Sequence, residues 1–423
     1  MSGRVDPAVP AAGPTPVERD LRRILWVQGV RAFTYGFGSI LMGSALASGG
    51  LSDAKVGLVF TAMLLGMALS SIGVGLWGDR IGRRPLYVAL LATMGVAGAV
   101  FALTKWLPAL LVAALTGTLS TDPNESGPIT SLEQAMIGQA PAASRVRVFG
   151  RYNAIAYLAG AVGALAAGGP ALFRHVIPAL PADRRFLLAF PLFAAACLWP
   201  ARRLSPAMEA ERDQDAAPLR RPLVRSRRNV FKLSGLFAMD AFGGGFVVQA
   251  FLVFWFHRKF GAGPELMGAV FFGAGVLQAA SSLVAVRVAS RIGLLNVMVF
   301  THLPSNLLLA AVPFAPTLAG AIALLLARFA LSQMDVPTRQ AYVVAMVDPS
   351  ERTAAAATTN MARYAVRPAG PVAAGALMQH IALGAPFVVA GVIKVIYDGL
   401  LYRVFRRVPL EEGAATPPRR SGS

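Results

Sequence analysis

Long apolar segments recur along this chain of 423 residues, and they limit its fold more than any other feature. Each has roughly the 20 residues that an α-helix needs to cross the hydrocarbon core of a membrane. Helices satisfy their own backbone hydrogen bonds, which lipid cannot do, so segments of this kind are helical. The sequence therefore predicts an all-α membrane protein of about twelve transmembrane helices, centred near Phe37, Leu65, Met94, Leu115, Leu158, Phe193, Val247, Val276, Leu307, Leu325, Val372 and Val392.

The composition supports a lipid environment. Hydrophobic residues make up 55% of the chain and charged residues only 14%, whereas about 25% of a soluble protein is charged. The net charge of +19 would suggest nucleic acid in a soluble protein. Here the basic clusters lie in alternate short loops and are not interleaved with aromatic residues, so we expect a lipid bilayer and no nucleic acid among the partners.

The distribution of positive charge predicts the orientation in the membrane. If both termini are cytoplasmic, 27 of the 40 Lys and Arg residues lie on the cytoplasmic side, 7 lie on the opposite side and the rest lie within helices. Basic residues are retained in the cytoplasm during insertion. The sequence thus predicts a multi-pass protein of the cell inner (cytoplasmic) membrane with both termini in the cytoplasm.

A polar stretch near the middle divides the chain into two halves. It runs from Ala201 to Arg228 and contains several prolines and an arginine run. We expect a disordered cytoplasmic tail, a first six-helix bundle, a cytoplasmic linker, a second six-helix bundle and another disordered cytoplasmic tail at residues 1–23, 24–200, 201–229, 230–407 and 408–423 respectively.

The two halves resemble each other in sequence. Three regions match in the same order at offsets of 207, 209 and 211 residues; the aligned pairs include Tyr157 with Tyr364, Gly163 with Gly370, Arg31 with Asp240, Gly57 with Gly268 and Gly82 with Gly293. Two six-helix bundles in the same orientation are related by a pseudo-two-fold axis along the membrane normal. A substrate site is then expected between the halves, near the middle of the membrane.

The loop after the second apolar segment carries a recognisable motif. It reads Gly75-Leu76-Trp77-Gly78-Asp79-Arg80-Ile81-Gly82-Arg83-Arg84-Pro85. It resembles the signature loop of the major facilitator superfamily, and the resemblance covers roughly Leu25 to Phe405. The resemblance implies the fold of that superfamily and a cytoplasmic gate formed by Gly75, Asp79, Arg80, Gly82, Arg83 and Arg84.

By this resemblance, Asp79 bridges to the other half when the transporter faces outward. The second-half copy of the motif is degenerate, because Ser290 replaces the acid and Leu294 and Leu295 replace the arginine pair. The gate is therefore expected to be asymmetric. Drug–proton antiporters of the superfamily usually carry an arginine in helix 4, and none lies between Leu107 and Gln139, which weakens a drug-export function.

Charged residues inside membrane spans are costly, and they are usually paired or functional. Arg31 and Asp240 occupy equivalent places in the first and seventh segments. We expect them to face the central path and to pair with each other or to bind an ionic substrate and a proton. The alternative is that each is buried in a structural pair with another neighbour.

The fourth segment contains prolines and a glycine that a regular helix cannot continue through. Broken backbone is tolerated in a membrane where it lines a cavity or is covered by protein, so Asp122, Glu125 and Glu133 are candidates for contact with substrate or protons. The alternative places Asp122 and Glu125 in an extracytoplasmic loop, with the helix beginning near Pro128.

The last three segments carry further intramembrane charges. Asp335 and Arg339 are four residues apart and share a helix face, so they pair with each other or serve the cavity. Lys394 and Asp398 have the same spacing and are expected to neutralise each other. Three further arginines need anionic partners or an anionic substrate, and they complete the set of candidates for the substrate or proton path: Arg328, Arg363 and Arg367.

The sequence has no metal-ligand cluster, nucleotide-binding loop or hydrolase motif, so we expect no enzyme activity, no cofactor and no bound metal. The leading expectation is a monomeric secondary transporter that works by alternating access and exports a small organic compound in exchange for protons. One alternative is uptake or facilitated diffusion of an organic anion. Another is a membrane sensor on the same fold that does not transport.

Overall fold

The computed structural model describes residues 15–122, 127–138, 142–174, 176–179, 183–209, 223, 225–348 and 351–408. Every regular element in these residues is a helix, and helices lie at eleven of the twelve predicted centres; the seventh, Val247, falls in the turn between α9 and α10. Nine segments in the described part of the chain are long and apolar enough to cross a membrane. The first, fourth and eleventh positions fall outside those nine, because their segments are either charged or broken.

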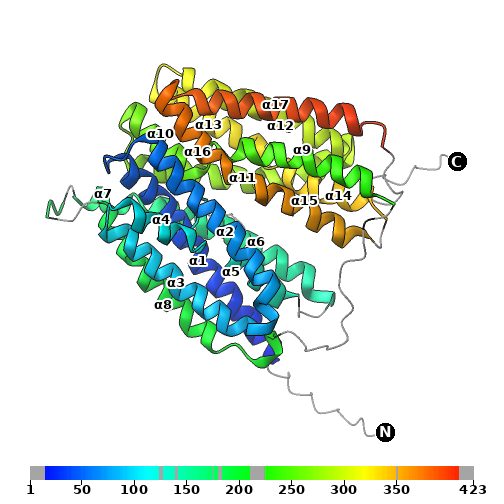
Figure 1. The fold of residues 1–423 in the computed structure, drawn as a ribbon, viewed down its shortest axis with the longest axis horizontal. Coiled ribbons are helices and arrows are strands. Elements are labelled where there is room, and N and C mark those ends of the chain that lie inside the picture. The colour runs from blue at the N-terminus through cyan, green and yellow to red at the C-terminus, as the bar shows by residue number, and fades with distance from the viewer. Residues whose placement is uncertain are drawn as a thin grey trace, which may run out of the picture.

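The first half forms one bundle, in the lower part of Figure 1. Its elements are α1 (Pro16–Ala47), α2 (Asp53–Ile81), α3 (Arg83–Leu103), α4 (Leu107–Leu115), α5 (Pro128–Ile137), α6 (Ala142–Ala166), α7 (Gly169–Arg174), the 3₁₀ turn η1 (Asp183–Leu188), α8 (Ala189–Arg202) and the 3₁₀ turn η2 (Pro206–Met208).

The second half forms the other bundle, in the upper part of Figure 1. Its elements are α9 (Arg227–Gly245), α10 (Gln249–Phe260), α11 (Pro264–Ile292), α12 (Leu294–Ala311), the 3₁₀ turn η3 (Val312–Phe314), α13 (Leu318–Ser332), α14 (Asp335–Met346), α15 (Arg352–Val366), α16 (Ala369–His380) and α17 (Ala385–Phe405).

The fourth transmembrane segment is broken, as the prolines predict. α4 ends at Leu115, and α5 begins at Pro128 with Gly127 in extended backbone before it. Gly117 has a φ of 70°, which favours glycine because a side chain is strained there. The tenth segment is interrupted between Ser332 and Asp335, so the fourth and tenth segments are each split into two helices.

Close helix crossings confirm that the two halves are structural repeats. A Cβ atom placed on Gly36 of α1 would lie 2.0 Å from the carbonyl oxygen of Gly160 on α6. The equivalent crossing in the second half joins Gly245 of α9 to the carbonyl oxygen of Arg367, at 2.4 Å. These residue pairs are related by the offsets of 209 and 207 that align the sequences.

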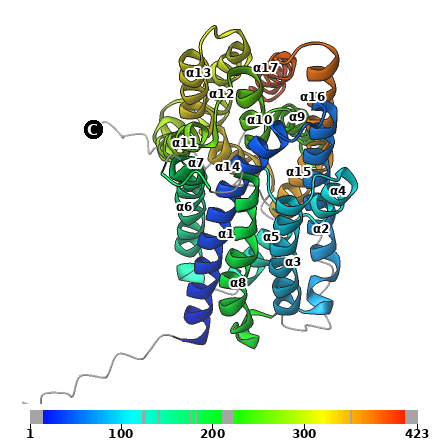
Figure 2. The same cartoon turned by 90° about the vertical axis from the view of Figure 1, so that its left-hand side faces the viewer.

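The halves meet at one end of the molecule and diverge toward the other. We call the end where α1 begins, α8 ends, α9 begins and α17 ends the linker face, and the other end the opposite face. In Figure 1 the bundles spread apart toward the linker face. Figure 2 shows α1 running up to α10, which belongs to the other half, near the opposite face.

Two pseudo-symmetric crossings close the opposite face. α2 packs against α16, where a Cβ on Gly57 would lie 2.4 Å from the carbonyl oxygen of Pro371. α6 packs against α11, where a Cβ on Gly268 would lie 2.4 Å from the carbonyl oxygen of Ala164. Polar contacts reinforce this seal, including hydrogen bonds from Gln249 to Ser39 at 2.9 Å and from Ala250 N to Thr121 O at 3.1 Å.

This packing predicts that Gly57→Ala weakens the conformation seen here. The added methyl group has no room beside the Pro371 carbonyl, so α2 and α16 must separate. Overpacking of this kind costs about 1–3 kcal/mol, which shifts a two-state equilibrium by about 5-fold to 150-fold. Spin labels on Ile81 of α2 and Met361 of α15 report the shift, because both side chains are about half exposed and lie on different halves.

The matched control is Gly150→Ala on α6, where an added Cβ meets no atom within 4 Å. That variant keeps the wild-type distance distribution between the two labels. The native Cys197 is fully buried, so the introduced cysteines take the labels. A wild-type distribution in Gly57→Ala contradicts the role assigned to this crossing.

Candidate functional site

The signature loop after α2 lies on the linker face. α2 ends at Ile81, and Gly82 turns the chain into α3 with a φ of 101°. Gly293, its counterpart between α11 and α12, has a φ of 86°. An L-amino acid with a side chain is strained at such angles, which explains why both repeats place glycine at this turn.

Contacts within the first half hold the beginning of α3. Glu209 accepts hydrogen bonds from the backbone N–H groups of Arg83 and Arg84 at 2.6 and 3.1 Å. A carboxylate is favourable at a helix N-terminus because of the free N–H groups and the helix dipole. Arg83 also reaches the carbonyl oxygen of Ala135 at 3.4 Å, and Arg84 donates to that of Arg202.

The gate role of this loop stays a prediction. Gly75 is exposed on α2, with open space where a Cβ would be, and Arg80 is exposed one residue before the end of that helix. The side chain of Asp79 lies outside the described residues. Sequence reasoning missed Glu209, which follows the last helix of the first half and shows no motif of its own.

A buried ion pair lies inside the first half. Arg31 on α1 donates to Glu133 on α5 at 2.7 Å, and both side chains are almost fully buried. Glu133 also accepts hydrogen bonds from Tyr87 at 2.8 Å and Tyr152 at 2.6 Å. Arg31 donates to Gln28 and lies 5.3 Å from the ring centre of Tyr35. The cluster is therefore charge-balanced, and its carboxylate is surrounded by donors.

Asp240 lies in a second buried cluster, inside the other half. Lys394 on α17 contacts it at 2.5 Å, Arg339 on α14 at 3.5 Å and His302 on α12 at 3.8 Å. Arg339 also pairs with Asp335 at 2.9 Å, as the spacing on one helix face predicts. Three helices thus bring cationic or ionisable groups to the single acid of α9.

The second cluster extends to Asp398 on α17. Its carboxylate contacts His302 Nδ1 at 2.8 Å and accepts a hydrogen bond from Asn306 Nδ2 at 2.9 Å. The expectation that Lys394 and Asp398 neutralise each other is wrong, because Lys394 reaches across to Asp240 instead. Sequence reasoning also missed His302, which looked isolated until α12 packed against α17.

Arg31 and Asp240 occupy equivalent positions but do not pair with each other in this conformation. Each has its partners in its own half, with the signs reversed: a cation on α1 meets an acid on α5, and an acid on α9 meets a cation on α14. These contacts match the alternative expectation from the sequence, in which Arg31 and Asp240 are each buried in a structural pair with another neighbour. Membrane burial makes such pairing necessary.

Residues from both halves converge on the space between the two clusters. Arg328 on α13 lies within electrostatic range of Asp240 and Asp335 from its own half and of Asp122 from the other half. Tyr157 on α6 lies near Asp122 and Asp335 in the same way. Asp122 thus lies within electrostatic range of Arg328 in the other half, and its role stays a prediction; Glu125 lies outside the described residues.

Two arginines of the second half, Arg328 and Arg363, each keep a hydrogen-bond donor without an acceptor among the described residues. Arg363 on α15 lies close to Asp240, Asp335 and Arg339. The Nε atoms of Arg328 and Arg363 are buried and have no hydrogen-bond partner among the described residues. Arg367, one turn after Arg363, lines a small recess with Tyr364 and α2. We call Arg328, Arg363 and Arg367 the central arginines.

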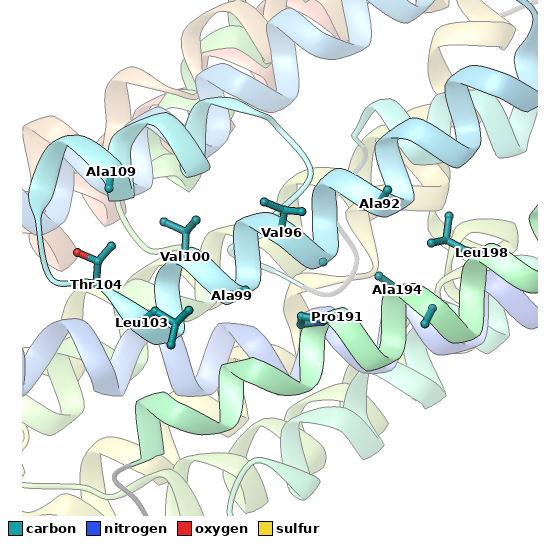
Figure 3. A pocket seen from close by; sticks show the side chains of 12 residues that line it. Ala92, Val96, Ala99, Val100, Leu103, Thr104, Ala109, Pro191, Ala194 and Leu198 are labelled. Carbon is teal, nitrogen blue, oxygen red and sulfur yellow. The ribbon is translucent and has the colours of Figure 1, made fainter.

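A hollow with a volume of about 540 Å³ lies elsewhere, on the outside of the first bundle. It lies between α3 and α8, next to α4, as Figure 3 shows. Small and apolar side chains line it, such as Ala92, Val96 and Ala194, and no charged residue takes part. An apolar surface on the outside of a membrane protein faces lipid, so this hollow is not the site where the charges converge.

Similar proteins confirm the class of the fold. A model of the Major Facilitator Superfamily matches residues 24–257. The chain is 25% identical to the uncharacterized membrane protein YJR124C of Saccharomyces cerevisiae, over 92% of this chain and 94% of that protein.

Solved structures agree with the family match. A bacterial homologue of the human lysosomal transporter Spinster, in an inward-facing conformation, has a TM-score of 0.71 at 14% identity and covers 94% of this chain and 98% of its own. The xylose transporter XylE from E. coli, in an inward-open conformation, has a TM-score of 0.67 at 14% identity over 93% and 98% of the two chains. Identities this low establish the fold alone. With the family model matching more than half of its length, the chain belongs to the major facilitator superfamily and is a multi-pass membrane transporter, not an enzyme.

Proposed function

We propose that this protein is a secondary transporter that moves a small organic anion by alternating access, coupled to protons. It acts as a monomer in the cell inner membrane, with the linker face and both termini in the cytoplasm. The excess of basic residues on that face supports this orientation. In this orientation the structure is the inward-open state, because the halves are sealed at the opposite face and diverge toward the cytoplasm.

The unused Nε donors of Arg328 and Arg363 carry the proposal for the substrate. A buried guanidinium without a full set of acceptors is costly, and a carboxylate or phosphate matches its planar donors well. Arg328 lies near Asp122 of the opposite bundle, and Arg363 lies near Asp240 and Asp335 of its own bundle. An anion bound beside these arginines lies next to groups of both halves. Its binding can therefore favour one arrangement of the two halves over another.

Electrostatics supports coupling to protons in the same direction as the anion. A negative solute beside Arg363 and Arg328 adds negative potential next to Asp240, which raises proton affinity in the second cluster. By linkage, a bound proton then strengthens binding of the anion equally. Because the proton and the anion strengthen each other's binding, the two are expected to move in the same direction, as in symport and uptake. Export of small organic compounds, which the sequence alone favoured, stays the alternative. Measuring the direction of transport distinguishes export from uptake.

A thermal-shift screen of the purified protein tests the substrate class. The panel contains mono- and dicarboxylates, phosphate esters, neutral sugars and lipophilic cations, each measured at acidic and neutral pH. We expect stabilisation by organic anions, and more of it at acidic pH. A ligand at one hundred times its Kd adds about 2.7 kcal/mol.

Arg363→Gln and Arg328→Gln remove one cation each from the proposed site. We expect each variant to weaken the anion found in the screen by about 10-fold to 100-fold, because a charge-assisted hydrogen bond is worth about 1.5–3 kcal/mol. Arg291→Gln, an exposed residue on the linker-face end of α11, is the matched control and keeps wild-type affinity. Stabilisation by lipophilic cations alone contradicts the anion proposal, and no response to any solute favours the sensor alternative.

A further inference from the structure

The two buried clusters differ in whether they can exchange a proton. In the first half, one cation meets one acid, and the acid accepts hydrogen bonds from two tyrosines as well. Every group around Glu133 is a donor, so this cluster has a single stable charge state. The second cluster holds three acids, Asp240, Asp335 and Asp398, against two permanent cations, Lys394 and Arg339.

His302 decides the charge of the second cluster. With a neutral imidazole, these acids and cations leave one negative charge, and with an imidazolium they balance. Arg363 and Arg328 lie within electrostatic range of Asp240 as well. They are free to neutralise a bound anion only when the remaining cluster is balanced without them.

The contact between His302 and Asp398 requires a proton. Nδ1 and a carboxylate oxygen lie 2.8 Å apart, and both are acceptors unless one of them carries hydrogen. Asn306 Nδ2 donates to the other oxygen of Asp398 at 2.9 Å and lies 3.1 Å from His302 Nδ1, to which it can donate only when that nitrogen is bare. We take the arrangement in which Nδ1–H donates to the ionised Asp398 and Asn306 Nδ2 donates to that carboxylate alone.

The other ring nitrogen is then the exchangeable position. Nε2 lies 3.8 Å from Asp240, whose nearer partner is Lys394 at 2.5 Å. When Nε2 is bare it opposes a carboxylate, and when it carries a proton it pairs with that carboxylate. Adding one proton at Nε2 converts the neutral ring to the cation and breaks no other bond.

We infer that His302, held by Asp398 and Asn306, carries the coupling proton of this transporter on Nε2, and that Asp240 links it to the anion site. The inference rests on the proposed function and adds the proton site to it. The other ionisable groups around His302 are Tyr397, whose ring packs edge-on at 5.9 Å, together with Asp335 and Arg339 on α14. Neither Asp335 nor Arg339 contacts the imidazole in the described structure.

The first test observes the proton directly and needs no substrate. The variant His175→Gln/His257→Gln/His380→Gln leaves His302 as the single histidine of the chain. We expect its ¹⁵N resonances in lipid nanodiscs to change from the neutral to the charged pattern as the sample is taken from alkaline to acidic pH. A ring that keeps one charge state over this range overturns the inference.

The second test connects the proton to the conformational change. Spin labels on Ile81 and Met361 measure the separation of the halves on the linker face, with protons as the only added ligand. We expect acid to change the wild-type distance distribution at least several-fold in population, and His302→Gln to abolish that response. His380→Gln, on an exposed histidine at the end of α16, keeps it.

The outcomes separate this inference from the proposed function. If the labels respond to acid equally in wild type and His302→Gln, the proton is carried elsewhere and the inference fails while alternating access stands. If the labels fail to respond to acid or to any anion from the screen, the proposed function itself fails. Should His302→Gln not fold, the resonance measurement on the otherwise native site decides the question.

Discussion

Glu133→Gln is expected to destabilise the protein by about 3–5 kcal/mol. The substitution keeps the shape of the side chain but removes the charge that balances Arg31 at 2.7 Å. Breaking a buried ion pair from one side leaves an uncompensated charge, which is the costly case. The amide also presents an N–H group to surroundings that donate, since Tyr87 and Tyr152 both donate to the native carboxylate.

Thermal unfolding in detergent measures this effect. The double variant Arg31→Met/Glu133→Leu removes both charges and is expected to recover most of the lost stability, since replacing a buried pair by apolar groups is often neutral. Glu265→Gln, at an exposed position in the first turn of α11, changes stability by less than about 0.5 kcal/mol. If Glu133→Gln melts like the wild type, the first cluster is not the static ion pair described above.

Asp240→Asn is expected to abolish coupled transport and to destabilise the protein as well. The carboxylate neutralises Lys394 at 2.5 Å, and it is the group that connects His302 to the central arginines. Without it, Lys394 is buried with no counter-charge in contact. Loss of transport in this variant alone therefore has two possible causes, which a second substitution separates.

Asp240→Asn/Lys394→Gln removes both members of that pair. We expect the double variant to regain most of the stability lost in Asp240→Asn, because no isolated charge remains, and to stay inactive in accumulation driven by a pH gradient. Melting curves and uptake into proteoliposomes, with an anion identified by the screen, provide the two readouts. Wild-type accumulation by the double variant rules out a coupling role for Asp240.

The sequence predicts the fold well because its signals are local. Membrane-length apolar segments give the helices, Gly127 and Pro128 mark the break between α4 and α5, and Gly82 and Gly293 mark equivalent turns in the two halves. The repeat offsets even specify which small residues cross, as in Gly57 with Pro371 and Gly268 with Ala164.

The partners inside the site could not be predicted in the same way. Asp335 and Arg339 lie on one helix face, so their pairing follows from spacing alone. Lys394 and Asp398 have the same spacing, yet they part because α17 packs between α9 and α12 and each side chain finds a nearer partner there. Which side chains meet depends on how helices cross, and sequence spacing along one helix does not contain that information.

The charge census along the chain had a similar limit. It identified Arg31, Glu133 and Asp240 as intramembrane charges but not the tyrosines that surround Glu133 or the histidine beside Asp240. Tyrosine and histidine are common on helix faces and give no signal by themselves. They become part of a site only when the bundle brings them to a buried carboxylate.

Transport into proteoliposomes tests the central claim most directly. The protein is reconstituted, a pH gradient is imposed with the linker-face side alkaline, and uptake of a labelled anion from the screen is followed. We predict accumulation above the external concentration that collapses when a protonophore removes the gradient and is lost in Arg363→Gln. Folded protein that binds the anion yet neither accumulates nor exchanges it would contradict the account.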